Sequence, residues 1–139
     1  MLRAVLDTNV LVAGVLSRSG APAHLLQRWH RGEFELVVSP LLLDELTRVL
    51  AYPKLRSRVP ADRAAAFVDL LAAAAEHRDD PGVAPGLASR DPDDDYLLAL
   101  AAASSAFLVT GDDDLLELAP DAPVHSPAAF LELVDTTVR

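Results

Sequence analysis

The stretch of sequence that decides the fold is Arg3–Asn9, which reads RAVLDTN. Its first four residues predict a short buried strand that ends at an acid, Asp7. Asp7, Thr8 and Asn9 all carry side chains that cap the amino ends of helices, so a helix over residues 9–16 is expected to follow at once. A buried strand that passes directly into a helix is the first half of a strand–helix–strand unit, and it predicts an α/β fold.

Outward from this stretch, strands and helices continue to alternate along the chain. We expect further strands at residues 35–39 and 106–110 and near Val124, and further helices at residues 22–31, 40–51, 60–76, 92–104, 112–118 and from 126 onward. Alternation with short connections predicts a central parallel sheet of four to five strands with helices on both faces, a three-layer α/β/α sandwich. Because the sequence shows no internal repeat and no linker, residues 1–139 are expected to form one domain.

The composition is that of a soluble globular domain, with 51% hydrophobic and 24% charged residues. No apolar run approaches the roughly 20 residues that a membrane span needs. The first residues lack the apolar stretch of a secretory signal, so a cytoplasmic protein without membrane contact is expected. The chain has no cysteine, which excludes a disulfide framework, a thiolate metal site and a cysteine nucleophile.

The charge balance leaves the substrate class open. Twelve Lys and Arg residues stand against 21 Asp and Glu residues, which gives a net charge of −9. A protein that binds nucleic acid by neutralising phosphates usually has the opposite sign. Either nucleic acid is not the substrate, or many of the acids serve to hold cations.

Acids follow two of the predicted strands directly. Asp7 ends the first strand, and Asp112 comes just after the strand at residues 106–110. Ligands of open parallel sheets bind at the carboxyl ends of the strands, so both acids are candidates for a functional site. Each of them alone is equally suited to capping the helix that follows it.

Glu45 lies on the apolar side of the helix predicted after the second strand. Its neighbours three and four positions away are Leu41, Leu42, Arg48 and Val49, of which three are apolar. A buried carboxylate is costly without a cation or a hydrogen-bond network, so this position favours a functional role. The alternative is that Glu45 pairs with Arg48 at the edge of the apolar stripe.

The densest acidic cluster is DPDDD at residues 91–95. Acids are favourable at a helix amino end, but four in five positions exceed what capping requires. Asp94 has apolar residues three, four and seven positions later, so it is expected to project along the buried face. Asp95 is expected to be a near neighbour of the site, whereas Asp91 and Asp93 are interpreted as capping or solvent-facing residues.

Four carboxylates at one sheet edge repel one another unless a cation lies between them. A hard, oxygen-preferring divalent ion is the natural occupant, and Mg²⁺ held by a few carboxylates, water and substrate phosphate fits these residues. Zinc is less suitable, because the chain has no cysteine and its four histidines show no ligand spacing.

Four motifs in this sequence together resemble the PIN domain. They are VLDTN at residues 5–9, SP at 39–40 followed by Glu45, DPDD at 91–94 leading into LLALA at 97–101, and VTGD at 109–112. The resemblance covers nearly the whole chain and is closest to the bacterial and archaeal branch of VapC-like toxins of toxin–antitoxin pairs. It implies a three-layer nuclease fold and Mg²⁺- or Mn²⁺-dependent hydrolysis of RNA.

Carried over residue by residue, the resemblance assigns the site. Asp7, Glu45, Asp94 and Asp112 match the four family acids, which bind metal and act in catalysis. Asn9 and Thr110 match the polar residues that support them. Shifting the third motif by one residue would place Asp95 instead of Asp94 in the third position, so Asp95 remains the alternative.

RNA and protein partners are expected as well. The positive charge that holds RNA is expected from Arg48, Lys54 and Arg56, unless these residues form only a solvated face. A homodimer and a cognate antitoxin are predicted from two helices rich in apolar residues, which carry Leu25, Leu26, Trp29, Phe67, Leu70 and Leu71. The alternative, that all six belong to the core, stays open.

Two other function classes compete with the nuclease. A response-regulator-like phosphoacceptor also places acids at strand ends, but it needs a lysine after a late strand, and the only lysine here is Lys54. A PIN-like module without catalysis, which acts only by binding protein or RNA, is the stronger alternative. No Ser–His pair, phosphate-binding loop or dinucleotide fingerprint is present, since Gly111 is a lone glycine after a strand.

Overall fold

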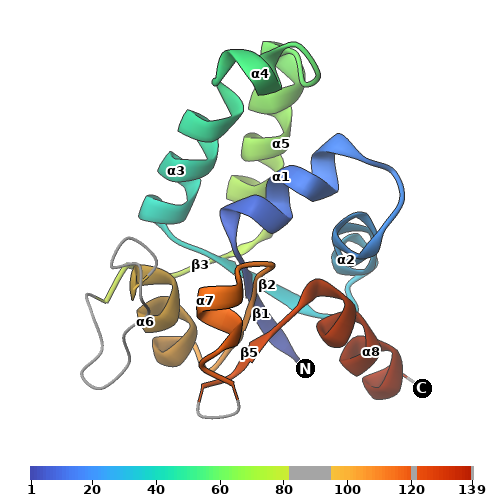
Figure 1. Ribbon diagram of the computed structural model, residues 1–139, viewed down its shortest axis with the longest axis vertical. Helices are drawn as coiled ribbons and strands as arrows, with labels where there is room; N and C mark the ends of the chain where they lie inside the picture. Colours follow the sequence, from blue (N-terminus) through green and yellow to red (C-terminus); the bar gives the residue numbers. More distant parts are fainter. Residues whose placement is uncertain (82–94, 120–121, 139) are drawn as a thin grey trace.

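The computed structural model describes residues 1–81, 95–119 and 122–138 (Figure 1). Within these residues one parallel sheet of five strands has the order β3-β2-β1-β4-β5. The strands are β1 (Arg3–Leu6), β2 (Glu35–Val38), β3 (Glu76–His77), β4 (Phe107–Val109) and β5 (Val124–His125). The predicted parallel sheet is therefore confirmed, with β1 at its centre.

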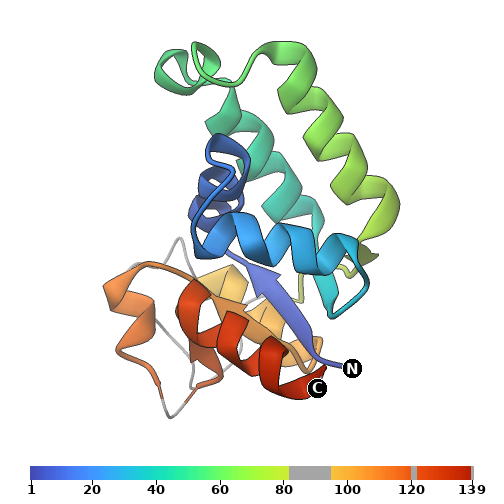
Figure 2. The ribbon, with the colours of Figure 1, turned by 90° about the vertical axis from the view of Figure 1, so that its right-hand side faces the viewer.

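Helices cover the sheet on both sides (Figures 1 and 2). They are α1 (Thr8–Leu16), α2 (Ala21–His30), α3 (Pro40–Leu50), α4 (Pro53–Arg56), α5 (Ala61–Ala74), α6 (Asp95–Ala103), α7 (Asp113–Leu116) and α8 (Pro127–Thr137). α1, α2, α3 and α5 lie on one side and α6 and α7 on the other, whereas α8 packs against β5 and α2. This arrangement confirms the predicted α/β/α layers. In the described part of the chain, no helix has both the length and the apolarity to cross a bilayer.

The order of the strands makes the central strand β1 a topological switch point. From β1 the chain moves outward through β2 to β3, and it then returns to the other side of β1 with β4. At such a switch point the connections leave in opposite directions, and ligands bind at the carboxyl ends of the strands there. Because Leu6 pairs with Val109, the residues that follow, Asp7 and Thr110, lie side by side at this edge.

The core holds these strands rigidly in place. Ala4, Val5 and Leu6 are completely buried, as expected of a central parallel strand that is covered on both faces. On α3, Leu42 and Leu46 are fully buried and share one helix face. The strand ends that carry the candidate acids therefore project from a packed framework.

α1 and α2 pack closely at Gly14. A Cβ atom at this position would lie 2.5 Å from Leu26 Cδ1 and 3.1 Å from the Pro22 carbonyl oxygen. A side chain here would require the Leu26 side chain to move and the Pro22 carbonyl oxygen to shift slightly, and glycine avoids both changes. Leu26 is half-buried.

Two elements have no counterpart in the sequence prediction. Residues 60–76 are predicted as one helix, but α5 ends at Ala74 and residues 76–77 form β3 beside Val37 and Val38. The alanine-rich sequence holds no helix breaker, so this ending depends on tertiary pairing with β2. The basic residues that follow Tyr52 form the short helix α4, which begins at Pro53.

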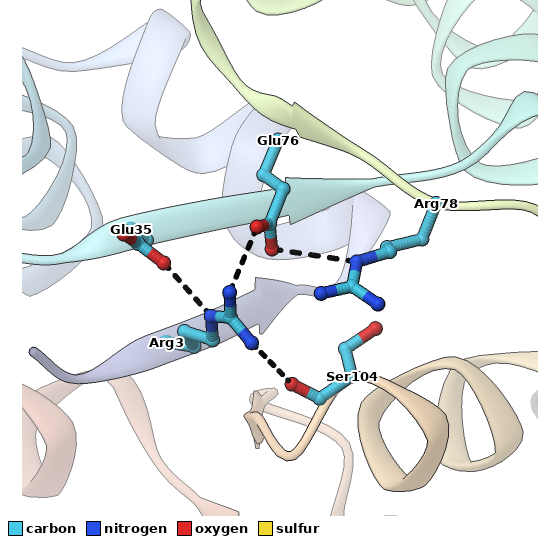
Figure 3. Close-up of polar contacts among 5 residues, drawn as sticks. All are labelled: Arg3, Glu35, Glu76, Arg78 and Ser104. Atoms are coloured by element: carbon cyan, nitrogen blue, oxygen red, sulfur yellow. Dashed lines mark hydrogen bonds and ion pairs between the residues drawn. The ribbon is translucent and has the colours of Figure 1, made fainter.

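Charged residues join three strands at the amino edge of the sheet (Figure 3). Arg3 Nε donates to Glu35 Oε2 at 2.8 Å, and Arg3 Nη2 donates to Glu76 Oε1 at 2.9 Å. The same guanidinium donates to the Ser104 carbonyl oxygen at 3.3 Å, and Arg78 Nε lies 3.6 Å from Glu76 Oε2. The hydrogen bond from Arg3 lowers the pKa of Glu35. At this edge the carboxylates are thus paired with arginines.

Candidate active site

Asp7 is the centre of the acids at the carboxyl edge. It follows β1 and caps α1, its Oδ1 accepting a hydrogen bond from the Asn9 backbone N–H at 3.3 Å. Its Oδ2 accepts from Thr110 Oγ1 at 2.7 Å. The residue is only 5% exposed. Asp7 is therefore a helix cap, as one interpretation of the sequence holds, and at the same time a buried carboxylate fixed at the switch point.

Thr110 connects the two acids that follow the strands. Its hydroxyl is fully buried, donates to Asp7 Oδ2, and accepts from the Asp112 backbone N–H at 3.0 Å. Asp112 caps α7, its Oδ1 accepting from the Asp114 backbone N–H at 2.9 Å. One hydroxyl thus sets both the Asp7 side chain and the backbone that carries Asp112.

The electrostatics of Asp7 reflect two of the other predicted acids, Glu45 and Asp112. Burial raises the pKa of the Asp7 carboxyl, and the hydrogen bonds from Thr110 and Asn9 oppose this rise without cancelling it. The negative charges of Glu45 and Asp112 raise the pKa further. Within the described residues, neither Asp7 nor these two acids form an ion pair with an arginine or lysine.

Glu45 reaches this edge from the second turn of α3. It is half-buried and lies beside the fully buried Leu42 and Leu46, so it is at the border of the apolar stripe. Its Oε2 accepts a hydrogen bond from the Tyr96 hydroxyl. Arg48 is exposed and makes no ion pair with it in the described structure. The alternative in which these two residues pair is therefore not observed.

Tyr96 is a site residue that the sequence reasoning missed. It lies on α6, directly after Asp95, and its hydroxyl crosses to Glu45 on α3. Burial raises the pKa of this hydroxyl, and the hydrogen bond to Glu45 raises it further. The sequence signal that could have identified Tyr96 is its position directly after an acidic cluster, before a run of only Leu and Ala residues in the same helix.

The acidic cluster at 91–95 is described only from Asp95 onward. Asp95 is the first residue of α6 and is 9% exposed, in agreement with a position near the site. Asp94, together with Asp91 and Asp93, lies outside the described residues. The assignment of Asp94 as the third acid therefore stays a prediction, and so does its alternative, Asp95.

The side chains at this edge fit a hard divalent cation by their chemistry. The donors are carboxylate oxygens, which hard divalent cations prefer, and the negative charges of Glu45 and Asp112 both act on the buried Asp7 carboxyl. As they stand, the described residues contain no group of three or more acids or histidines close enough to hold a metal, so these carboxylates do not by themselves form a closed coordination shell.

The predicted RNA-binding residues do not gather at the acids. Arg48 is exposed on α3, one turn beyond Glu45. Lys54 and Arg56 lie on α4, at the end of α3 that is farther from the sheet (Figure 1). Arg56 is half-buried and lines a cavity of about 340 Å³ between α3 and α5. These three residues form a basic flank along α3 and α4, beside the site and not inside it.

Sequence comparisons relate this chain to known proteins over most of its length. Residues 3–114 match the family model described as PIN domain. MJ1680, an uncharacterized protein of Methanocaldococcus jannaschii, is 26% identical over 117 residues, which make up 84% of this chain and 75% of that protein. The family match spans β1, α3, α6 and β4, the elements next to the candidate acids.

Solved structures with the same fold include three proteins from different organisms. VapBC2 from Rickettsia felis, bound to a DNA fragment from its promoter, aligns with a TM-score of 0.62 and 16% identity, covering 90% of this chain and 98% of that one. PAE2754 from Pyrobaculum aerophilum aligns with a TM-score of 0.65 and 19% identity, covering 97% of this chain and 90% of that one. FitAcB from Neisseria gonorrhoeae aligns with a TM-score of 0.53 and 19% identity, covering 89% of this chain and 97% of that one. At these identities the likeness establishes a shared fold.

Proposed function

Because this chain belongs to the PIN domain family, we propose that it is a metal-dependent endoribonuclease whose site is built from Asp7, Glu45, Asp94 and Asp112. The observation that carries the proposal is the buried Asp7 carboxyl, whose pKa is raised by burial and by the negative charges of Glu45 and Asp112. A buried acid with a perturbed pKa, at the switch point of a parallel sheet and without an ion-pair partner among the described residues, is typical of a functional site.

The cofactor in this proposal is Mg²⁺ or Mn²⁺. The four acids would hold it, with Asp95 replacing Asp94 if the third motif is shifted by one residue. When bound, such a cation supplies Lewis-acid chemistry, which activates water and offsets the negative charge that builds up on the phosphate. Phosphodiester hydrolysis then needs no side-chain nucleophile, in agreement with the absence of cysteine.

The protein side chains contribute position and electrostatics. Thr110 and the Asn9 backbone N–H fix the two oxygens of Asp7, and the α7 backbone fixes Asp112. Asn9 itself is exposed at the start of α1, where its side chain can contact a phosphate. The basic flank of Arg48, Lys54 and Arg56 would hold the RNA beside the acids, which offsets locally the unfavourable net charge of −9.

The test is cleavage of a labelled single-stranded RNA by purified protein with Mg²⁺, with Mn²⁺ and with EDTA. We expect cleavage with either cation, loss of cleavage in EDTA and recovery when excess Mg²⁺ is added. A mock preparation from cells that lack the gene controls for contaminating nuclease. Equal cleavage with and without chelator would rule out the metal-dependent mechanism.

We further infer that the protein forms a homodimer. Of the six apolar residues predicted for an interface, Leu25 and Leu71 are fully buried and belong to the core. The other four, Leu26, Trp29, Phe67 and Leu70, line a cavity of about 360 Å³ between α2 and α5. Leu70 is 43% exposed. Such an apolar hollow at the surface favours an interface, and we assign it to a second copy of the chain.

Light scattering at micromolar concentration measures the dimer. The expected result is twice the chain mass of 14.8 kDa, with a shift toward the monomer for Leu70→Glu. Leu41→Glu, at an exposed leucine on α3, is the matched control and should leave the mass unchanged. A native protein of monomeric mass argues against the dimer.

The proposed biological role is that of a toxin neutralised by an antitoxin in the cytoplasm. The fold shared with VapBC2 and FitAcB supports such a partner. Co-expression with the product of the neighbouring gene should yield a stable complex with suppressed RNA cleavage. The alternative function, a PIN-like module that only binds protein or RNA, predicts Mn²⁺ or RNA binding without any cleavage, and the same assays distinguish it.

A further inference from the structure

The three proposed site acids that the structure describes, Asp7, Glu45 and Asp112, are held in different ways. Asp7 follows β1 directly and Asp112 lies just beyond Thr110 and Gly111 after β4; both have short side chains, and backbone N–H groups donate to both of them. Glu45 lies on a helix and has a longer side chain with more rotamers, so its carboxylate is not positioned by the sheet. Something else must hold its carboxylate toward Asp7.

Among the described residues, the Tyr96 hydroxyl is the group that donates a hydrogen bond to the Glu45 side chain. Tyr96 is half-buried, between the buried residues Asp95 and Leu97 on α6. α6 itself packs against β1 and β4. A tyrosine ring has only two rotatable bonds, so a ring anchored on this helix presents its hydroxyl at a fixed place.

We propose that Tyr96 is a positioning residue that holds Glu45 in the orientation needed to bind the divalent cation. The inference deepens the proposed function and rests on it. The hydrogen bond engages Oε2 and leaves Oε1 of Glu45 available to a cation. It also joins α6, which begins at Asp95, to α3, which carries Glu45. Tyr96 thereby orients the Glu45 carboxylate by a hydrogen bond, as Thr110 orients the carboxylate of Asp7.

The arrangement around Tyr96 agrees with this role. Its hydroxyl lies close to the buried Thr8 hydroxyl and to the Asp7 carboxyl as well as to Glu45, so it stands inside the acidic site. Partners that orient metal-binding side chains typically change metal affinity by 10–100-fold when they are removed. A tyrosine that only filled space in α6 would not need its hydroxyl.

The experiment measures Mn²⁺ affinity by calorimetric titration of the full chain, independently of cleavage. We expect Tyr96→Phe to weaken Mn²⁺ binding about tenfold and to leave the melting temperature in EDTA near the native value. In RNA cleavage, Tyr96→Phe should need more Mn²⁺ for half-maximal rate but approach the native rate at saturation. Tyr52→Phe is the matched control, because Tyr52 is 48% exposed at the start of α4; it should change nothing.

A double-mutant cycle shows whether Tyr96 acts through Glu45. In the Glu45→Gln background, Tyr96→Phe should cause no further loss of Mn²⁺ affinity, because the residue it positions no longer carries charge. Native-like Mn²⁺ affinity of Tyr96→Phe overturns the inference, and so does a loss that adds fully to that of Glu45→Gln. If the native chain binds no Mn²⁺, the proposed function itself fails and the inference falls with it.

Discussion

Carboxylates at the two edges of the sheet lie in opposite electrostatic environments. At the amino edge, Glu35 and Glu76 accept hydrogen bonds from Arg3, and the pKa of Glu35 is lowered (Figure 3). At the carboxyl edge, Asp7 is buried near Glu45 and Asp112, and its pKa is raised. Arg28, Arg3 and Arg78 supply the ion pairs found in the described residues, and none of these pairs is at the carboxyl edge.

This difference separates structural charges from functional ones. Paired charges at the amino edge join β1, β2 and β3 and favour the folded state whether or not a ligand is present. At the carboxyl edge the buried Asp7 carboxylate opposes folding in the absence of a cation, because burial and the negative charges of Glu45 and Asp112 disfavour its ionised form. A protein retains such a cluster where its function requires it. The comparison therefore predicts opposite outcomes for similar substitutions at the two edges.

The largest effect is expected on RNA cleavage. Asp7→Asn removes the central carboxylate with little change in shape and should lower the cleavage rate at least about a hundredfold, since metal-assisted charge stabilisation contributes several kcal/mol. Glu35→Gln, a substitution of the same kind at the amino edge, should leave the rate near native. Initial rates with saturating Mg²⁺ measure both. Comparable rates for the two variants would mean that the edges do not differ in function.

An intermediate effect is expected from Thr110→Val, which removes the hydroxyl shared by the two strand-end acids. The change is nearly isosteric, but it leaves the Asp7 carboxylate and the Asp112 backbone N–H each without a buried partner. Such unsatisfied groups cost about 1–3 kcal/mol of unfolding free energy, and the displaced Asp7 should lower cleavage as well. Urea denaturation in EDTA measures the stability.

Thr136→Val is the matched control for Thr110→Val. Thr136 is exposed on α8, and its hydroxyl donates to the Glu132 carbonyl oxygen within the same helix. Its substitution should change stability by less than about 0.5 kcal/mol and leave cleavage at the native rate. If Thr110→Val is as mild as this control, the Thr110 hydroxyl does not organise the site.

The main elements of the fold could be predicted because their signals are local. The RAVLDTN stretch at residues 3–9 holds a buried strand and a helix cap within seven positions. β3 could not be predicted in this way, since its two residues are extended only because they pair with Val37 and Val38. The sequence around them is helical by composition.

In the candidate site, too, local patterns predict some residues and miss another. Local patterns single out Asp7 and Asp112 after strands and Glu45 on one helix face, and in the structure the charges of Glu45 and Asp112 both act on Asp7. Tyr96 could not be found by such periodicity, because its partner Glu45 lies 51 positions away on another helix. A contact between α3 and α6 depends on how both helices pack at the edge of the sheet, which no local pattern specifies.

The smallest effects are expected in the pH dependence of stability without metal, where the two edges should have opposite signs. The pKa of Asp7 is raised above its ordinary value of 3.8, so its contribution is most favourable at low pH and is lost as pH rises through the unfolded and then the folded pKa. The pKa of Glu35 is lowered below its ordinary value of 4.5, so its contribution is present above that value and is lost as pH falls through the folded pKa.

Thermal melts of the native chain, Asp7→Asn and Glu35→Gln in EDTA, at a series of pH values from neutral to acid, test these signs together. At neutral pH, Asp7→Asn should melt at or above the native temperature, because the amide removes a buried charge near Glu45 and Asp112, and Glu35→Gln should melt slightly below it, because Arg3 loses a charged partner. Both differences in melting temperature should shrink as the pH falls, the first as Asp7 takes up its proton and the second as Glu35 does.

Saturating Mg²⁺ should raise the native melting temperature more than that of Asp7→Asn. If Asp7→Asn melts well below the native chain at neutral pH in EDTA, Asp7 acts mainly as the cap of α1, and the carboxyl edge is then stabilised by its acids in the same way as the amino edge.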